Sequence, residues 1–291
     1  MFKWKVVAIY GKIIRFISEF KEKKVALISS AFIALLCLIS AFPHFFARYK
    51  PNEICGTPWE PPSLTHPLGL DDVGKDVLSM LIYGTRTSLV VGFCAAFISS
   101  LIGLLIGIIS GFYGGIIDNA LMRITDFFLV IPNFPLMVVL AFILKPGIQT
   151  VVLAIVVVLW TQPAKLIRSE VLSLKERLYI VRAKVIGCSS FRILTKYILP
   201  RVLPLMFSTL VLAVGWAIPS EAFLSWIGLG DPTNISWGII LYYAFQRGAF
   251  TVGAWWHFIP PGVMILLSVI ALTFLGHSLE EIFNPKLPKS S

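Results

Sequence analysis

Long apolar runs alternate with shorter polar segments along most of this 291-residue chain. A helix rises about 1.5 Å per residue, so about 20 apolar residues cross a hydrocarbon core about 30 Å thick. The short, β-branched fourth run is assigned a helix from its position between polar segments. The predicted spans are residues 25–47, 89–112, 120–144, 147–162, 202–229 and 257–279. The pattern predicts an all-α integral membrane protein with six transmembrane helices.

The overall composition supports the membrane class. Hydrophobic residues make up 57% of the chain and charged residues only 14%, whereas soluble domains average about 25% charged residues. The formal net charge is +10. We attribute this excess to membrane orientation rather than to nucleic-acid binding, and we expect no nucleic-acid partner.

Basic residues are distributed unevenly between the two sides of the predicted bundle. Nineteen of the 25 Lys and Arg residues lie in the N-terminal segment, at Arg123, in residues 165–201 and in the C-terminal tail. The positive-inside rule places these segments in the cytoplasm. We therefore predict a multi-pass protein of the cell (cytoplasmic) membrane with both termini cytoplasmic. The Pro- and Gly-rich loops 48–87 and 230–256 are then external.

Residues 1–24 carry seven Lys or Arg residues interleaved with apolar residues. The apolar positions recur at helical spacing: Trp4, Ile9, Ile13, Phe16 and Phe20. This pattern predicts an amphipathic interfacial helix that lies on membrane lipid at the cytoplasmic leaflet. We divide the chain into this segment, a six-span domain at 25–288 and a short tail at 289–291.

Small residues occupy every fourth position of the second predicted span: Ala95, Ser99, Gly103, Gly107 and Gly111. Such a stripe lets another helix approach closely, so we assign it a packing role. In the third span, Pro132 and Pro135 predict a kink.

Three Asp, Glu, Lys or Arg residues fall inside predicted spans. Arg123 and Asp126 are three residues apart and can pair on one helix face, or Asp126 can belong to a translocation pathway. Glu221 follows Pro219 in an apolar run, where a carboxylate is costly unless paired or solvated. We consider two roles for Glu221: a pathway residue that binds a peptide ammonium or a cation, or the cap of a broken helix.

One apparent nucleotide motif lies in the first external loop. Gly69, Gly74 and Lys75 match a P-loop, but Asp76 stands where Ser or Thr would hold magnesium, and no buried strand precedes the loop. We interpret this stretch as a turn-rich extramembrane segment. The four cysteines match no metal-ligand spacing, and the four histidines are scattered. We expect no catalytic, cofactor-binding or metal site in this chain.

The basic region 165–201 contains an apolar stripe that predicts one helix face: Leu174, Leu178, Val181 and Val185. Gly187 is a natural helix stop. Ser189 or Ser190 is a candidate cap for a second helix, in which Phe191, Leu194 and Ile198 line up and which Pro200 closes. Two short helices joined at a glycine would either dock into a partner's groove or lie in the lipid interface. The residues alone leave both open.

This loop resembles the conserved loop of permease subunits of ABC importers. The pattern there is Glu-Ala-Ala, three residues, Gly, nine residues, then an apolar residue, any residue and Leu-Pro. Four residues match in spacing: Ala183, Gly187, Leu199 and Pro200. Val181 stands at the glutamate and Arg182 at the first alanine. Three further stretches, residues 66–89, 221–241 and 261–287, resemble the second-permease type of the dipeptide/oligopeptide/nickel family.

The resemblance covers about residues 25–288 and implies a permease subunit that forms half of a translocation pathway. Its implied partners are a homologous permease subunit in a heterodimer, two ATPase subunits that bind ATP and Mg, and an extracytoplasmic solute-binding protein. The chain itself is then not an enzyme. A coupling helix at about 179–190 would contact an ATPase groove through Val181, Arg182 and Val185, with Gly187 at the turn.

Substrate is expected to be a dipeptide or oligopeptide, with oligosaccharides or nickel chelates as alternatives. A stand-alone secondary transporter is a more distant alternative. It would need internal repeats or a run of intramembrane charges along a path, and neither is evident in the sequence.

Overall fold

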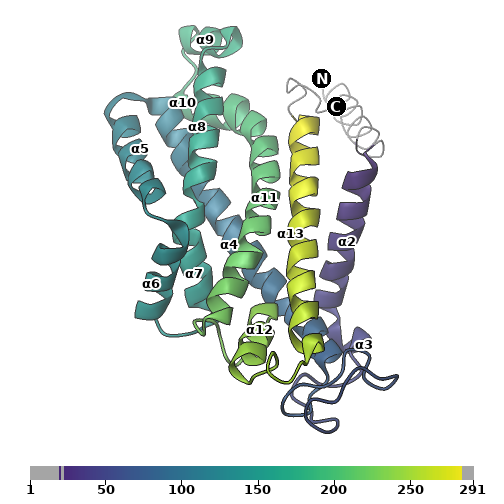
Figure 1. Ribbon diagram of the computed structural model, residues 1–291. Helices are drawn as coiled ribbons and strands as arrows, with labels where there is room; N and C mark the ends of the chain where they lie inside the picture. The colour runs from purple at the N-terminus through teal and green to yellow at the C-terminus, as the bar shows by residue number, and fades with distance from the viewer. Residues whose placement is uncertain (1–19, 21–22, 284–291) are drawn as a thin grey trace.

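The computed structural model describes residue 20 and residues 23–283. In this part of the chain all regular structure is helical, accompanied by two isolated β-bridges. Residues 1–19 and 21–22 of the predicted N-terminal interfacial helix, and the tail at 289–291, lie outside the described residues. The predicted all-α fold is confirmed (Figure 1).

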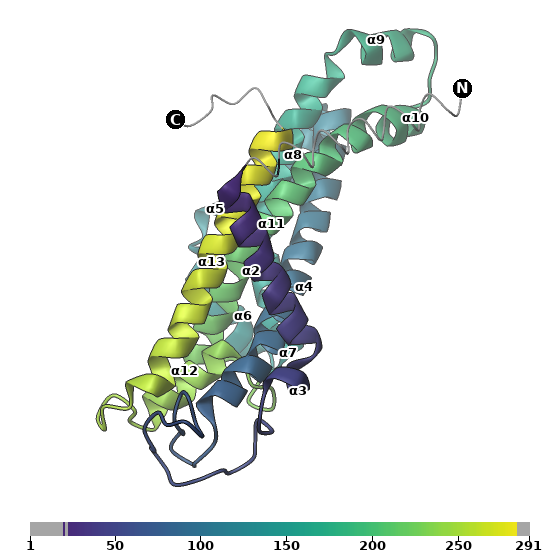
Figure 2. The same cartoon turned by 90° about the vertical axis from the view of Figure 1, so that its right-hand side faces the viewer.

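The helices pack side by side into an elongated bundle (Figures 1 and 2). One end of the bundle carries α9, and we call it the α9 end. The opposite end carries the loops 47–76 and 227–254, and we call it the loop end. In chain order the helices are α2 (Lys24–Ala41), α3 (Pro43–Phe46), α4 (Val77–Tyr113), α5 (Gly115–Val130), α6 (Asn133–Ile143), α7 (Ile148–Leu159), α8 (Thr161–Lys175), α9 (Leu178–Val185), α10 (Ser190–Ile193), the π-helical turn η1 (Leu194–Ile198), α11 (Leu199–Trp226), α12 (Trp237–Gln246) and α13 (Trp255–Phe283).

Within the described residues, five helical segments are long and apolar enough to cross a membrane, and a sixth span results if α5 and α6 count as one. The first span ends at Ala41, short of its predicted end, whereas the second, fourth, fifth and sixth each extend beyond at least one of their predicted ends. The second begins at Val77 because Asp76 caps it, with Asp76 Oδ2 accepting a hydrogen bond from Ser79 N at 2.8 Å. The fourth continues through α7 and α8 from Ile148 to Lys175.

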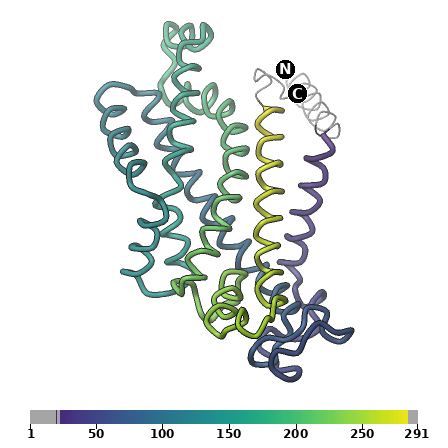
Figure 3. Tube along the Cα trace, in the orientation of Figure 1, coloured from purple at the N-terminus to yellow at the C-terminus, as the bar shows by residue number. Residues whose placement is uncertain are grey.

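The third predicted span is broken rather than kinked. α5 and α6 meet at an angle of 91°, and Figure 3 shows the chain turning between them. Ile131 is extended there, with φ −75° and ψ 128°, because the ring of Pro132 disfavours helical geometry in the preceding residue. Pro135 falls in the first turn of α6, where a missing amide costs little.

The predicted stripe of small residues packs α4 against α8. A Cβ atom added to Gly103 would lie 2.6 Å from Pro163 Cβ, and one added to Gly107 would lie 2.7 Å from the Ala164 carbonyl oxygen. A Cβ on Gly111 would lie 2.8 Å from Val171 Cβ. These separations are too short for any side chain. We call this contact the α4–α8 glycine seam, and it confirms the predicted packing role.

A partly buried ion pair reinforces the seam near the α9 end. Arg168 of α8 donates Nε and Nη2 hydrogen bonds of 2.6 Å each to the two oxygens of Asp118 on α5. Ser110 of α4 donates to the same carboxylate. Because a bidentate arginine–carboxylate pair fixes geometry as well as energy, these three residues hold α4, α5 and α8 in one register.

The loop end is closed by polar contacts between the first loop and the later helices. Arg247, at the end of α12, donates to Asp72 Oδ2 at 2.6 Å, and Trp256 Nε1 donates to the Leu70 carbonyl oxygen at 3.1 Å. Asp71 Oδ1 accepts from the amides of Val73 and Lys75. The apparent P-loop is therefore an irregular loop, as predicted. Two of its amides donate hydrogen bonds to the carboxylate of Asp71, which belongs to the same loop.

We predict that Gly107→Ala lowers the thermal unfolding midpoint of the detergent-solubilised protein, because the added methyl group overpacks the α4–α8 glycine seam at a cost of about 1–3 kcal/mol. Gly262→Ala in α13 is the matched control. A Cβ at Gly262 meets nothing within 4 Å, so alanine there is neutral or slightly stabilising. Equal midpoints for the two variants would contradict the packing role of the seam.

Candidate functional site

The short helix α9 stands beyond the spans at the α9 end (Figures 1 and 2). Its inner face is apolar and buried. Ile180 and Ala183 are buried in a cluster that includes Leu174 of α8 and Val202 of α11. The Arg201 guanidinium of α11 lies 4.8 Å from the centre of the Tyr179 ring. α9 is thus fastened to both α8 and α11.

The outer face and end of α9 expose apolar side chains beside two basic ones, Arg182 and Lys184. Val185 is 82% exposed and the adjoining Ile186 80% exposed. Val181 and Leu178 are exposed as well. Solvated helix faces are normally polar, so this face is typical of a surface that a partner or lipid covers.

The predicted apolar stripe does not lie on one helix. α8 ends at Lys175 and α9 begins at Leu178, so Leu174 belongs to α8 and is buried. Ala183, which the resemblance places in the coupling motif, is buried too. Val181, Arg182 and Val185 remain exposed. Their contact with a partner groove stays a prediction.

Gly187 ends α9 in a turn that requires a left-handed residue. Its φ is +78°. Cys188 N donates to the Ala183 carbonyl oxygen at 3.0 Å, and Gly187 N donates to that of Lys184 at 3.0 Å. These two bonds form the Schellman motif, in which glycine avoids the steric cost of positive φ. Ala183 therefore shapes the turn through its backbone, while its side chain is buried.

The second predicted helix of the region 165–201 begins at one of the predicted caps but does not end where the sequence predicted. Ser189 is the cap, accepting a hydrogen bond from Arg192 N at 3.4 Å. Pro200 does not close the helix, because the π-helical turn Leu194–Ile198 leads directly into α11. Pro200 falls in the first turn of α11, where a missing amide is tolerated. Leu199 and Pro200 consequently form the root of α11, not the projecting end of the loop.

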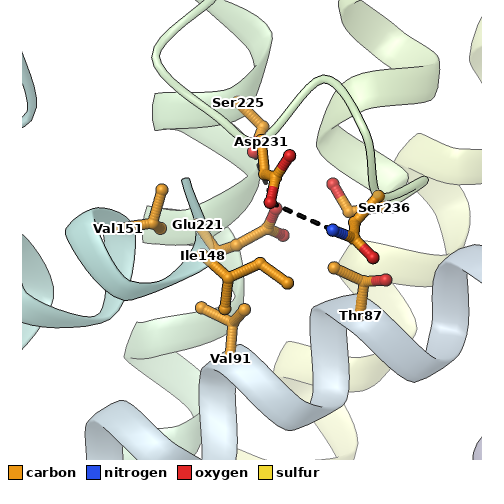
Figure 4. Close-up of a pocket in the computed structure, with 9 residues that line it drawn as sticks. Thr87, Val91, Ile148, Val151, Glu221, Ser225, Asp231 and Ser236 are labelled. Carbon is orange, nitrogen blue, oxygen red and sulfur yellow. Dashed lines mark hydrogen bonds between the residues drawn. The ribbon is translucent and has the colours of Figure 1, made fainter. Parts of the chain in front are cut away.

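Glu221 lies at the centre of a buried polar cluster toward the loop end (Figure 4). It is 2% exposed, and its carboxylate accepts hydrogen bonds from Ser225 Oγ at 2.7 Å and Ser88 Oγ at 3.2 Å. Ser88 Oγ in turn accepts from Trp237 N at 3.1 Å. The cluster joins α4, α11 and α12. α11 continues unbroken past Pro219, so Glu221 does not cap a broken helix.

Sequence reasoning missed Asp231, which lines the same small pocket as Glu221 (Figure 4). Asp231 accepts from Thr233 N at 2.9 Å, Thr233 Oγ1 at 2.6 Å and Asn234 Nδ2 at 3.0 Å. Burial acts to raise its pKa, but these hydrogen bonds together hold the pKa below its ordinary value. The sequence Asp-Pro-Thr-Asn at 231–234 is typical of a turn, and this pattern is the signal in the sequence that points to Asp231.

Asp126 lies in a different place from Glu221. It ion-pairs with Lys165 Nζ of α8 at 2.7 Å, whereas the sequence suggested Arg123 as its partner. Lys165 was missed because α8 was expected to belong to the cytoplasmic loop. The two candidate pathway residues line separate pockets. Among the described residues, no group of three or more His, Cys, Asp or Glu side chains is placed to hold a metal ion.

Comparison with known proteins identifies two family matches. Residues 103–289 match the binding-protein-dependent transport system inner membrane component family. Residues 13–62 match the N-terminal TM domain of oligopeptide transport permease C.

Named relatives cover most of the chain. The oligopeptide transport system permease protein OppC of Bacillus subtilis is 33% identical over 93% of this chain and 88% of its own length. The dipeptide transport system permease protein DppC of Haemophilus influenzae is 35% identical over 92% of each chain. A solved structure of the MetNI methionine ABC transporter, in an inward-facing conformation, covers 70% of this chain and 96% of its own chain, with 19% identity and a TM-score of 0.55. This likeness supports the fold.

We predict that Glu221→Ala lowers the thermal unfolding midpoint strongly, because it leaves the hydroxyls of Ser88 and Ser225 without their acceptor at a cost of about 2 kcal/mol or more. Glu221→Gln retains an acceptor oxygen and is expected to lose much less. Ser220→Ala is the matched control, since Ser220 Oγ donates only within its own helix, to the Trp216 carbonyl oxygen. A midpoint for Glu221→Ala equal to that of Ser220→Ala would refute the role of Glu221 in joining three helices.

Proposed function

The chain belongs to the family of binding-protein-dependent transport system inner membrane components, and we propose that it is one of two permease subunits in an ATP-driven peptide importer. The observation that carries this proposal is α9, a short helix that exposes apolar side chains on its outer face and is fastened to two spans. Such a helix suits the groove of a partner protein. The described residues otherwise form membrane spans and the segments that connect them.

The substrate class is inferred from the named relatives. The oligopeptide and dipeptide permease proteins match over most of their own length as well as most of this chain. Peptides are therefore the proposed substrate. Oligosaccharides and nickel chelates are the competing substrate classes that an uptake assay must include.

The proposed transporter contains four membrane-associated subunits and one external one. A homologous permease subunit pairs with this chain, and each contributes half of the translocation pathway. Two ATPase subunits bind ATP and Mg and carry out hydrolysis, so this chain is not itself an enzyme. An extracytoplasmic solute-binding protein delivers the substrate at the loop end. Both termini and the α9 end face the cytoplasm, in line with the excess of Lys and Arg there.

Transport requires that movement of the ATPase subunits reach the spans. α9 supplies the connection, because its outer face contacts the ATPase subunit while Ile180 and Tyr179 hold its inner face to α8 and α11. The α4–α8 glycine seam then carries α4 along with α8. ATP shifts the permease between its two access states only if α9 contacts the ATPase subunits differently in each state.

The direct test is uptake of labelled dialanine into proteoliposomes that contain this chain with its partner permease, its ATPase subunits and its binding protein. We expect uptake that requires ATP and that is lost when residues 178–185 are scrambled. Labelled oligosaccharide and nickel chelate serve as substrate controls. Uptake that continues without ATPase subunits would refute the proposal and favour a stand-alone secondary transporter.

We predict that Gly187→Val abolishes ATP-dependent uptake, because a β-branched residue is strongly disfavoured at φ +78° and the turn after α9 is lost. Gly187→Asn is the matched control, since asparagine tolerates the left-handed region, and we expect it to retain most activity. No atom lies within 4 Å of a Cβ at this position, so crowding does not confound the comparison. Full activity of the valine variant at normal expression would contradict the assigned role of the turn.

A further inference from the structure

A shallow groove on one face of α5 combines charged and apolar side chains. It is lined by Arg123, Asp126, Phe127, Val130 and Ile131. Val130 is 83% exposed, and Phe127 is also exposed. Because α5 with α6 forms the bent candidate span, this groove lies on the outer surface of the chain at a level where lipid or another subunit must cover it.

The charges lie deep along their helices. Asp126 is eleven residues from the start of α5, about 16 Å along the axis, and Lys165 is ten residues from the end of α8, about 15 Å. The start of α5 and the end of α8 both lie at the α9 end (Figure 1). The Asp126–Lys165 pair therefore lies about 15 Å into the bundle, on two helices that belong to candidate membrane spans. Arg123 is one turn nearer to the α9 end.

These charged groups are not shielded by their own chain. The side chains of Asp126 and Lys165 are 58% and 45% exposed. Arg123 is exposed as well, and it has no hydrogen bond or ion pair with any residue that the structure describes. Ionisable groups inside membranes almost always face a bundle interior or a water-filled cavity. In the isolated chain this face is external, so it must be internal to the assembled transporter.

We propose that the α5 groove is a wall of the water-filled translocation path and that Arg123 binds the carboxylate end of the passing peptide there. This inference rests on the proposed function. A guanidinium group offers paired donors that match a carboxylate. The Asp126–Lys165 pair is neutral, which leaves the groove with a net positive charge from Arg123. Phe127 and Val130 supply apolar contacts that suit peptide side chains of varied size.

The test measures labelling of a cysteine in the groove by water-soluble thiol reagents. Val130→Cys is placed in a background in which Cys37, Cys55, Cys94 and Cys188 are replaced by serine, and the complete transporter is assembled in nanodiscs so that both faces are accessible. Leu266→Cys on α13 is the matched control, because it is also an exposed apolar position on a span. A negatively charged sulfonate reagent and a positively charged trimethylammonium reagent are compared.

We expect labelling at Val130→Cys but not at Leu266→Cys, with the sulfonate reagent favoured by about tenfold through the local positive potential. Arg123→Gln should remove this preference, and Arg123→Lys should retain it. Millimolar dialanine should slow the labelling, while dialanine amide, which lacks the carboxylate, should slow it less. Arg123→Gln should lose the protection by dialanine.

Labelling at Val130→Cys no faster than at Leu266→Cys would overturn the proposal, since the groove would then face lipid or be sealed by the partner permease. Rapid labelling without protection by dialanine, or equal protection by the amide, would overturn the assignment of Arg123 to the carboxylate. ATP-dependent uptake by the unmodified transporter is measured in parallel. It reports on the proposed function independently of where the α5 groove lies.

Discussion

The close contact between α4 and α8 is the constraint on which the rest of the structure depends. Three glycines on α4 allow the backbone of α8 to approach so closely that a single added carbon atom would collide. In a membrane, where apolar burial gives little drive for helix association, such packing is a main source of stability. The same contact brings Arg168 against Asp118 and sets the position from which α9 projects.

The seam also links the two ends of the bundle. α4 is 37 residues long, about 55 Å at 1.5 Å per residue, and it carries Ser88 in the buried cluster at the loop end and the glycines toward the α9 end. Glu221 joins α11 to α4 toward the loop end. The apolar cluster that buries Ile180 of α9 joins α11 to α8 toward the α9 end. A displacement of α9 therefore acts on a connected set of helices rather than on one span.

The sequence predicted features that follow from local chemistry. The spans were predictable because the apolar runs are long enough to cross a bilayer. The glycine seam follows from small residues at every fourth position, and the turn at Gly187 follows because a helix commonly ends in a residue with positive φ, which glycine favours. The missed features depend on which helices meet. Nothing local reveals that Lys165 would approach Asp126, that Ser88 would donate to Glu221, or that a π-helical turn would carry the chain past Pro200. Leu174 was assigned to the wrong helix because helical spacing does not register a break of two residues between α8 and α9.

The central claim is that α9 docks against an ATPase subunit. The most direct measurement replaces Val185 with a photoreactive amino acid in the assembled transporter and identifies the protein to which it cross-links. A cross-link to the ATPase subunit, absent from the same probe at Ile270 on the exposed face of α13, is the predicted result. Adducts confined to lipid at position 185 would contradict the account, because α9 would then lie in the membrane interface rather than in a partner groove.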